Sequence, residues 1–417
     1  MRRILMIAYH FPPLAGSSGI QRTLRLAQHL PALGWQPIIL TTHERAYERC
    51  SHDLLGDVLP ETQVYRAQAW DTARHFSMAG RYPAALARPD RWATWRFDGV
   101  RLGRRLIDKF KPDLLWCTYP IATAMVIGTE LQRLTGVPLV ADFRDPMAQI
   151  DYPTDPITRA HFFNIEKRAI GAAVLSTFTT RSAAAEYRQR YPSAEGRIQV
   201  LENGHDEDAF VDAGAMAAQG PLTPGAQTLL HSGVIYPSER DPSKLIAALG
   251  QLHRTAVITP DRFKIRFRAS SADDLLRQFG AREGVLDYLE LLPPIGYRAA
   301  LSEMMRADGL LLLQAANCNS QVPAKLYEYL RSGRPILGMT DAQGDTAAAL
   351  SACGVSKTVA LDDTSSIIKV LEQFIREDAG YPDISWREGL VANPALARQT
   401  SRRERARQFS EMLSQIS

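Results

Sequence analysis

Short continuous apolar segments alternate with amphipathic helical segments, and this alternation restricts the fold more than any other feature. Strands without polar alternation, separated by helices, are typical of parallel sheets covered on both faces. The first half therefore predicts an α/β domain with a doubly wound sheet. The strands of this half are expected at 4–8, 37–42, 113–118, 138–143, 174–179 and 197–201, and helices near 20–33, 121–134, 157–171 and 182–190.

The same alternation begins again at residue 228, after a stretch rich in small residues, glycine and proline. We therefore expect two Rossmann-like doubly wound domains that face a cleft, with a C-terminal helix packing back towards the first domain. The predicted boundaries are 1–205 for the first domain, 206–227 for a linker, 228–394 for the second domain and 395–417 for the terminal helix.

Composition fits an ordinary globular protein, because a net charge of +4 over 417 residues implies no particular partner. Four widely spaced cysteines suit a reducing cytoplasm and show no metal-ligand spacing. Pro12 and Pro13 break the N-terminal apolar run, so no signal peptide is expected. The apolar window at 114–128 is too short to span a bilayer. We expect a cytoplasmic protein that meets a membrane only peripherally.

Ligands of open parallel sheets bind beyond the carboxyl ends of strands, so the residues that follow strands are the first candidates. Gly16, Ser17, Ser18 and Gly19 follow the first strand and open a helix whose free N–H groups suit a phosphate or a sugar hydroxyl. The pattern is not the dinucleotide-binding G-x-G-x-x-G. A plain glycine–serine turn is the alternative.

The sequence ADFRDP (141–146) gathers Asp142, Arg144 and Asp145 at the end of another strand. An electrostatic role for Arg144 and a structural Asp–Arg pair are both compatible with it. In the second half, Arg240 comes shortly after Gly233, just before a predicted helix, which suits an anionic ligand. A solvated surface arginine is the alternative.

Lys325 and Glu328 lie three residues apart and therefore share one helix face. A lysine provides a point charge for phosphate, and a glutamate accepts from the two hydroxyls of a ribose. A salt bridge between the two is the alternative.

Residues 74–111 hold ten Lys/Arg against three Asp, with six interleaved aromatic residues. This composition fits an amphipathic membrane-surface segment or a nucleic-acid patch. A solvated helix face whose aromatics pack inward is equally compatible. The expected interface residues for anionic lipid include Trp92 and Trp95.

The chain resembles the GT-B glycosyltransferases, in particular glycosyltransferase family four, over nearly its whole length. FPPLAGSSGIQRTLRLAQHLPALGW resembles the family's glycine-rich acceptor loop and first helix, and PAKLYEYLRSGRPIL resembles its donor-binding helix. The resemblance implies an acceptor site at Gly16, Ser17, Ser18, Gly19 and Arg22. It implies a donor site at Gly233, Arg240, Ser320, Pro323, Lys325, Leu326 and Glu328, and a catalytic role for Arg144, Asp145, Arg240 and Lys325.

Three positions depart from the family pattern. Ser320 replaces the first of two glutamates, Ile235 stands where an arginine is expected, and Arg144 takes the place of a histidine. The resemblance implies a retaining, metal-independent transfer of a sugar from a nucleoside-diphosphate sugar to a glycan, lipid-linked or small-molecule acceptor, without a cofactor or nucleic acid. A non-catalytic nucleotide-sugar binder and a GT-B epimerase are the alternatives.

Overall fold

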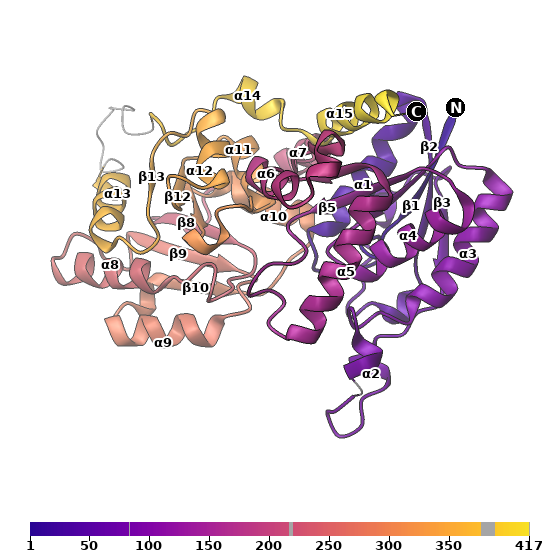
Figure 1. Ribbon diagram of the computed structural model, residues 1–417. Coiled ribbons are helices and arrows are strands. Elements are labelled where there is room, and N and C mark those ends of the chain that lie inside the picture. Colours follow the sequence, from indigo (N-terminus) through magenta and orange to yellow (C-terminus); the bar gives the residue numbers. More distant parts are fainter. Residues whose placement is uncertain (83, 217–219, 377–387, 417) are drawn as a thin grey trace. The chain divides into compact units, whose positions relative to one another are not determined.

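The computed structural model describes residues 1–82, 84–216, 220–376 and 388–416. The chain divides into two compact units, unit 1 with Met1–Asn203 and Arg402–Ser417, and unit 2 with Gly204–Ser401. Each unit is built on one parallel sheet with helices on both faces (Figure 1). The prediction of two Rossmann-like doubly wound domains is therefore confirmed.

The sheet of unit 1 has the strand order β3-β2-β1-β4-β5-β6-β7, and every neighbouring pair is parallel. The direction of winding reverses between β1 and β4, which makes this the topological switch point. The strands are β1 (Arg2–Ile7), β2 (Trp35–Thr42), β3 (Gln63–Ala67), β4 (Leu114–Thr118), β5 (Leu139–Arg144), β6 (Ala173–Phe178) and β7 (Ile198–Val200).

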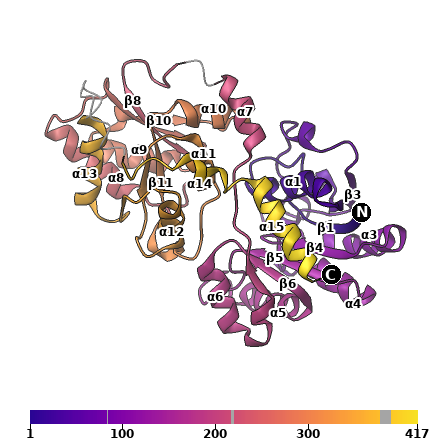
Figure 2. The same cartoon turned by 90° about the horizontal axis from the view of Figure 1, so that it is seen from above.

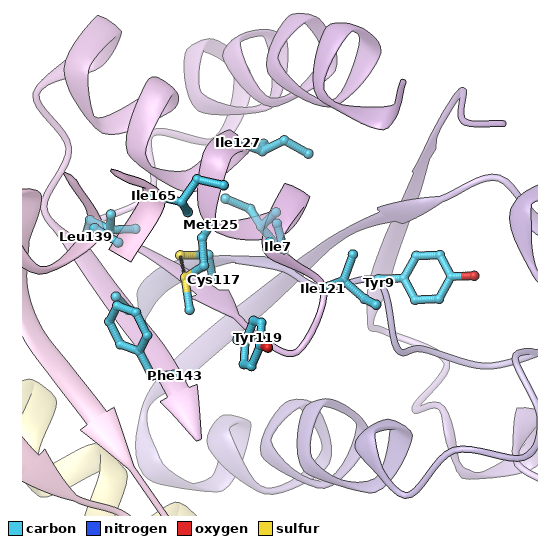
Figure 3. Close-up of a cluster of buried hydrophobic side chains, with 14 of the residues drawn as sticks. Ile7, Tyr9, Cys117, Tyr119, Ile121, Met125, Ile127, Leu139, Phe143 and Ile165 are labelled. Atoms are coloured by element: carbon cyan, nitrogen blue, oxygen red, sulfur yellow. Dashed lines mark hydrogen bonds between the residues drawn. The ribbon is translucent and has the colours of Figure 1, made fainter. Parts of the chain in front are cut away.

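Helices cover both faces of this sheet, and a separate hydrophobic layer lies under each face. Figure 3 shows part of one layer, where Cys117 of β4 and Met125 lie sulfur to sulfur at 3.3 Å. Cys117 thus packs as a small hydrophobic residue, as expected for a buried thiol. The helices are α1 (Gly19–His29), α2 (Thr72–His75), α3 (Trp95–Phe110), α4 (Ala122–Thr135), α5 (Pro156–Ala172), α6 (Arg181–Arg190) and α15 (Arg402–Gln415).

The sheet of unit 2 repeats this plan with the order β10-β9-β8-β11-β12-β13, so its switch point lies between β8 and β11. The strands are β8 (Gln227–Ser232), β9 (Phe263–Arg268), β10 (Leu289–Leu292), β11 (Gly309–Leu313), β12 (Ile336–Met339) and β13 (Thr358–Val359). The helices are α7 (Glu207–Met216), α8 (Ser243–Arg254), α9 (Asp273–Glu283), α10 (Tyr297–Arg306), α11 (Lys325–Ser332), α12 (Asp345–Ala352), α13 (Thr364–Arg376) and α14 (Pro394–Arg398).

The stretch 206–227, expected as a linker, contains helix α7 of unit 2. Phe210 of α7 is buried in the unit 2 core, and Glu207 forms a two-point ion pair with Arg331 of α11, with Nε–Oε2 at 2.7 Å. Ala209 and Ala213 of α7 are fully buried in the same core, so these small residues reflect close helix packing.

The terminal helix expected over 395–417 is two helices, α14 in unit 2 and α15 in unit 1. Figure 2 shows α15 in yellow alongside α1. Phe409 and Leu413 of α15 are fully buried in the hydrophobic layer beneath α1. The prediction that a C-terminal helix packs back onto the first domain is confirmed.

The basic stretch 74–111 forms α2, a loop and α3, and its two tryptophans face inward. Trp95 is fully buried, and Trp92 is half-buried with its Nε1 donating to the carbonyl of Ala46 at 3.0 Å. The expectation that these rings meet lipid headgroups is therefore wrong, because Trp95 lies in the unit 1 core and Trp92 packs against that core. Phe97 is 67% exposed and Met78 is 83% exposed, so other apolar side chains of this stretch do face solvent.

A buried ion pair connects α1 to the middle of the unit 1 sheet. Both oxygens of Asp142 on β5 accept from Arg22, at 2.8 and 2.7 Å, and they also accept from Thr118 and Thr177 on the flanking strands at 2.8 and 2.7 Å. Burial opposes ionisation of Asp142, but the charge and hydrogen bonds of Arg22 outweigh it and leave the carboxyl pKa lowered. Asp142 thus stabilises the fold at neutral pH, and this contribution is lost as the pH falls through its folded pKa.

We predict that Asp142→Ala lowers the free energy of unfolding by about 3–5 kcal/mol, because it leaves the Arg22 charge buried without its partner. Urea unfolding at pH 7 measures this. The matched control is Asp108→Ala, since Asp108 is exposed on α3. A loss for Asp142→Ala no larger than for the control would show that the pair does not hold α1 on the sheet.

Candidate functional site

The loop after β1 brings a histidine and two glycines to the switch point of unit 1. Gly16 has φ = 79°, a left-handed conformation that favours glycine. Gly19, the first residue of α1, is packed so closely that a Cβ atom would lie 3.0 Å from Arg144 Nη1 and 3.0 Å from the His10 ring. Only glycine lets these two side chains approach the start of the helix.

Arg144 ends β5 and points towards this loop. Its φ of 63° is unusual for a residue with a side chain, and its carbonyl is held there by the N–H and hydroxyl of Thr179, at 2.7 and 2.8 Å. The β5–β6 register shifts between Asp142 and Arg144, so the Arg144 side chain departs from the regular alternation of the strand. The sheet thus fixes the backbone that directs Arg144 at α1.

Asp145 and Arg22, the two other charged candidates of unit 1, have partners within the unit. Asp145 accepts from the Thr179 hydroxyl at 3.2 Å, and burial raises its pKa while the nearby Arg144 charge opposes the shift. Arg22 is bound to Asp142 and donates to the Leu201 carbonyl at 3.1 Å. Its guanidinium therefore holds the start of α1 in place beneath the Gly16–Gly19 loop.

Lys325 begins α11 in unit 2 and contacts the end of β8. Its Nζ lies 3.0 Å from His231 Nε2, and His231 Nδ1 lies 3.0 Å from the Leu311 carbonyl. A carbonyl only accepts, so His231 Nδ1 carries the proton and Nε2 accepts from Lys325. Burial and the positive charge of Arg240 hold the Lys325 pKa well below its usual value.

Glycine at position 233 keeps this lysine in reach of the strand end. Gly233 has φ = 110°, and a Cβ atom there would lie 3.3 Å from Lys325 Nζ. The Ser232 N–H donates to the Tyr329 hydroxyl at 3.0 Å, which fixes the end of β8 against α11. The switch point of unit 2 therefore presents one ammonium group at the start of a helix.

Glu328 lies one turn further along α11 and is 9% exposed. Its Oε1 accepts from the Tyr297 hydroxyl at 2.9 Å, and Tyr297 begins α10. The carboxylate is thereby oriented by a neighbouring helix.

Arg240 precedes α8 and folds back over the loop that follows β8. Its Nη1 donates to the Val234 carbonyl at 2.7 Å, and its guanidinium stacks 5.1 Å from the centre of the Tyr236 ring. Ile235 is 2% exposed and belongs to the hydrophobic core, so it provides no charge where the family has an arginine. Arg240 is close enough to Lys325 for its positive charge to lower the Lys325 pKa.

The remaining donor candidates surround the start of α11. Leu326 is fully buried in the unit 2 core, and its N–H donates to the Pro323 carbonyl at 2.9 Å. Ser320 is half-buried in the preceding loop. Gln314 secures that loop by donating from Nε2 to the carbonyls of Cys318 and Gln321, both at 2.9 Å. Pro323 and Leu326 thus shape the turn that presents Lys325.

Three side chains at these sites were not predicted. His231 and Tyr297 bond Lys325 and Glu328, which lie 94 and 31 residues away in the sequence. His10 faces Gly19, and burial together with the Arg144 charge lowers its pKa to about 3. The one available signal was position, because His10 and His231 both stand at the ends of the strands that border the switch points.

The glycosyl transferase 4-like domain family matches residues 18–204 of this chain. No curated protein matches the chain at a significant level. Sequence-distant solved structures share the fold along its whole length.

Three of these structures illustrate the range of activities on this fold. Sucrose-phosphate synthase from Thermosynechococcus elongatus is 14% identical, with a TM-score of 0.69 over 100% of this chain and 99% of that one. HepE from Anabaena, solved in complex with UDP, is 14% identical with a TM-score of 0.66, and both chains are covered completely. UDP-GlcNAc 2-epimerase from Neisseria meningitidis, bound to UDP-GlcNAc, is 11% identical with a TM-score of 0.59, again over 100% of both chains.

The domain match lies within unit 1, where it includes α1, β5 and the Arg144 region, and the fold similarity extends over both units. The strand orders of the two sheets are those of paired Rossmann-like domains. The chain thus has the GT-B fold, and its residues 18–204 match the glycosyl transferase 4-like domain family, in line with the resemblance to glycosyltransferase family four.

Proposed function

We propose that this protein is a retaining glycosyltransferase that moves a sugar from a nucleoside-diphosphate sugar to a glycan, lipid-linked or small-molecule acceptor. Unit 2 binds the donor and unit 1 binds the acceptor. The observation that carries the proposal is the group of Lys325, Arg240 and Glu328 at the switch point of the unit 2 sheet. Two cations with a carboxylate one helical turn away match a diphosphate followed by a ribose.

The departing diphosphate is stabilised electrostatically in this proposal. Lys325, Arg240 and the N-terminal end of α11 provide positive charge where negative charge develops during transfer. Such stabilisation requires neither a metal ion nor a protein nucleophile. On unit 1, Arg144 and Asp145 act on the acceptor side, and the loop Gly16–Gly19 contacts the acceptor.

Two experiments separate this function from the alternatives. A thermal-shift screen of nucleoside diphosphates identifies the base, since a ligand at a hundred times its dissociation constant adds roughly 2.7 kcal/mol to stability. Incubation of the matching nucleotide sugars with and without acceptors then shows the reaction. Transfer that requires an acceptor supports the proposal. Epimerised sugar without an acceptor would indicate an epimerase, and binding without turnover would indicate a non-catalytic binder.

We predict that Glu328→Ala weakens donor binding by about 1.5–3 kcal/mol, because a charged acceptor for ribose hydroxyls is lost. Isothermal titration calorimetry with the nucleoside diphosphate measures this effect. The matched control is Glu283→Ala, at the last residue of α9 and hence at the opposite edge of the sheet. Equal affinities for Glu328→Ala, Glu283→Ala and the unaltered protein would remove Glu328 from the donor site.

We predict that binding of a nucleoside diphosphate takes up a proton at Lys325. The pKa of Lys325 is lowered in the free protein by burial and by Arg240, and a bound phosphate raises it by favouring the ammonium form. Affinity should therefore fall as the pH rises through the window between these two pKa values. Calorimetry at pH 8 in two buffers with different ionisation enthalpies counts the protons.

The Lys325→Arg variant provides the control for that proton count, because a guanidinium stays charged throughout the range. It should bind the nucleotide without taking up the proton. Equal proton uptake by Lys325→Arg and the unaltered protein would assign the uptake to another group.

We also propose that unit 1 makes peripheral contact with anionic membranes through the loop that follows α2. None of the described helices is long and apolar enough to cross a bilayer. The loop exposes Met78 at 83%, Tyr82 at 41% and Leu86 at 44%. Arginines at positions 81, 101, 104 and 105 are exposed on the same loop and on α3. Exposed apolar side chains beside arginines favour an anionic lipid interface.

We predict that Met78→Ser with Leu86→Ser lowers partitioning onto anionic vesicles roughly tenfold, because two exposed apolar groups no longer enter the interface. Vesicle sedimentation at low salt measures it, and neutral vesicles should bind little. Leu286→Ser is the matched control, since Leu286 of unit 2 is also 44% exposed. Equal partitioning onto neutral and anionic vesicles would leave α3 as a solvated helix face.

A further inference from the structure

Helix α1 begins without any negative group to balance its positive end. Its first turn contains no acidic residue, and its first N–H groups are bonded only to neutral acceptors. The Gly19 N–H donates to Ser17 Oγ at 3.2 Å, and the Gln21 N–H donates to the Ser18 carbonyl at 3.2 Å. The helix dipole therefore leaves this end positive, which favours an anion. A helix terminus alone does not make a site, so the side chains around it decide what binds.

Arg144 is the side chain that makes this terminus distinctive. It is 8% exposed, its Nε has no hydrogen-bond partner, and its Nη1 makes one long contact of 3.5 Å with the Tyr119 carbonyl. Nη1 lies 3.0 Å from the Cβ position of Gly19, so the guanidinium is aimed at the first residue of α1. A buried cation with unused donors is costly unless a partner arrives.

The other groups around Arg144 do not supply that partner. Asp142 is committed to Arg22, and Asp145 is held by Thr179. Within the described part of the chain, no carboxylate forms an ion pair with Arg144. His10 stays neutral, since its pKa is lowered to about 3 by burial and by the Arg144 charge. The charges of Asp145 and Asp142 act on Arg144 without a direct ion pair, so its unused donors are left for a ligand.

A second arginine lies over the same loop. The guanidinium of Arg49 packs against Gly16, with Nη2 2.6 Å from the position of a Cβ atom, and the Arg49 carbonyl accepts from the Ala15 N–H at 3.0 Å. Arg49 is exposed, so it lies at the rim of the candidate site and not at its centre. Arg144 below and Arg49 at the rim bracket the start of α1 with positive charge.

We infer that the acceptor carries an oxyanion, a phosphate or a carboxylate group, and that unit 1 binds it between Arg144 and the start of α1. This inference rests on the proposed function and specifies its acceptor class. The planar fork of an arginine matches both anions, and the positive end of the α1 dipole adds to the attraction. A neutral sugar alone would give the Arg144 guanidinium no direct ion pair.

The test uses the full chain saturated with whichever nucleoside diphosphate gives the largest melting shift, so that the donor site is filled. Inorganic phosphate and glucuronate are then titrated separately by calorimetry. We expect binding of at least one of them, and which one binds identifies the class of anion. Arg144→Gln should weaken this binding about tenfold or more, since a charge-assisted pair is lost. Arg144→Lys should retain part of it, because the charge remains without the fork.

Gly19→Ala should also lower the affinity for the anion, because the added methyl group would occupy the space beside Arg144. Arg133→Gln, on the exposed face of α4, is the matched control and should bind as the unaltered protein does. Melting temperatures establish that each variant is folded.

Three results would overturn the inference. The first is that neither anion binds the nucleotide-saturated protein. The second is that Arg144→Gln binds the anion as well as Arg133→Gln does. The third is that Arg144→Gln loses affinity for the nucleoside diphosphate itself about tenfold, which would assign Arg144 to the donor. Failure of the proposed function is distinct, because the unaltered protein would then show no nucleotide shift at all, and the anion titrations would proceed on the unliganded chain.

Discussion

The buried ion pair between Arg22 and Asp142 is the contact on which the arrangement of unit 1 depends. Asp142 accepts from Arg22 and from threonines on both neighbouring strands, so a single carboxylate connects α1, β4, β5 and β6. Removing two charges from water is costly, and the pair is tolerated because every oxygen is satisfied. The same contact sets the height of α1 above the sheet, and with it the position of Gly19 beside Arg144. Fold and candidate site therefore share one electrostatic constraint.

In unit 2, hydrogen bonds position the candidate cation Lys325, where unit 1 uses an ion pair. His231 is fully buried, and the Leu311 carbonyl fixes which of its nitrogens carries the proton. The other nitrogen then accepts from Lys325 and holds that side chain at the end of β8. A neutral imidazole orients the Lys325 amino group without forming an ion pair with it, so no protein anion at this position competes with a ligand.

The sequence predicts the alternation of strands and helices well, because central parallel strands are uniformly apolar and therefore conspicuous. It fails where the pattern is weak. The edge strand β3 (Gln63–Ala67) is only half-buried along most of its length and carries polar residues. Helix α7 (Glu207–Met216) lies in a stretch rich in small residues, glycine and proline, which resembles a linker. In both cases tertiary packing decides the structure, and local composition does not reveal it.

The candidate sites show the same division. The spacing of Lys325 and Glu328 places them on one helix face, and strand-end positions single out Gly233 and Arg144. The partners His231, Tyr297 and His10 could not be predicted, since they come from segments that only the sheet topology brings together. Trp92 and Trp95 show the converse. Their composition suggests an interface, yet the unit 1 core provides the apolar surroundings that an aromatic ring needs.

Helix α15 gives unit 1 a discontinuous sequence, because it follows all of unit 2 in the chain. During synthesis the ribosome delivers α1 and the whole seven-stranded sheet long before Phe409 and Leu413 emerge. Until then the hydrophobic layer beneath α1 lacks the apolar side chains that α15 contributes to it. Unit 2 is complete earlier than unit 1, so nascent unit 1 presents a chaperone-accessible surface for the time needed to translate about two hundred residues.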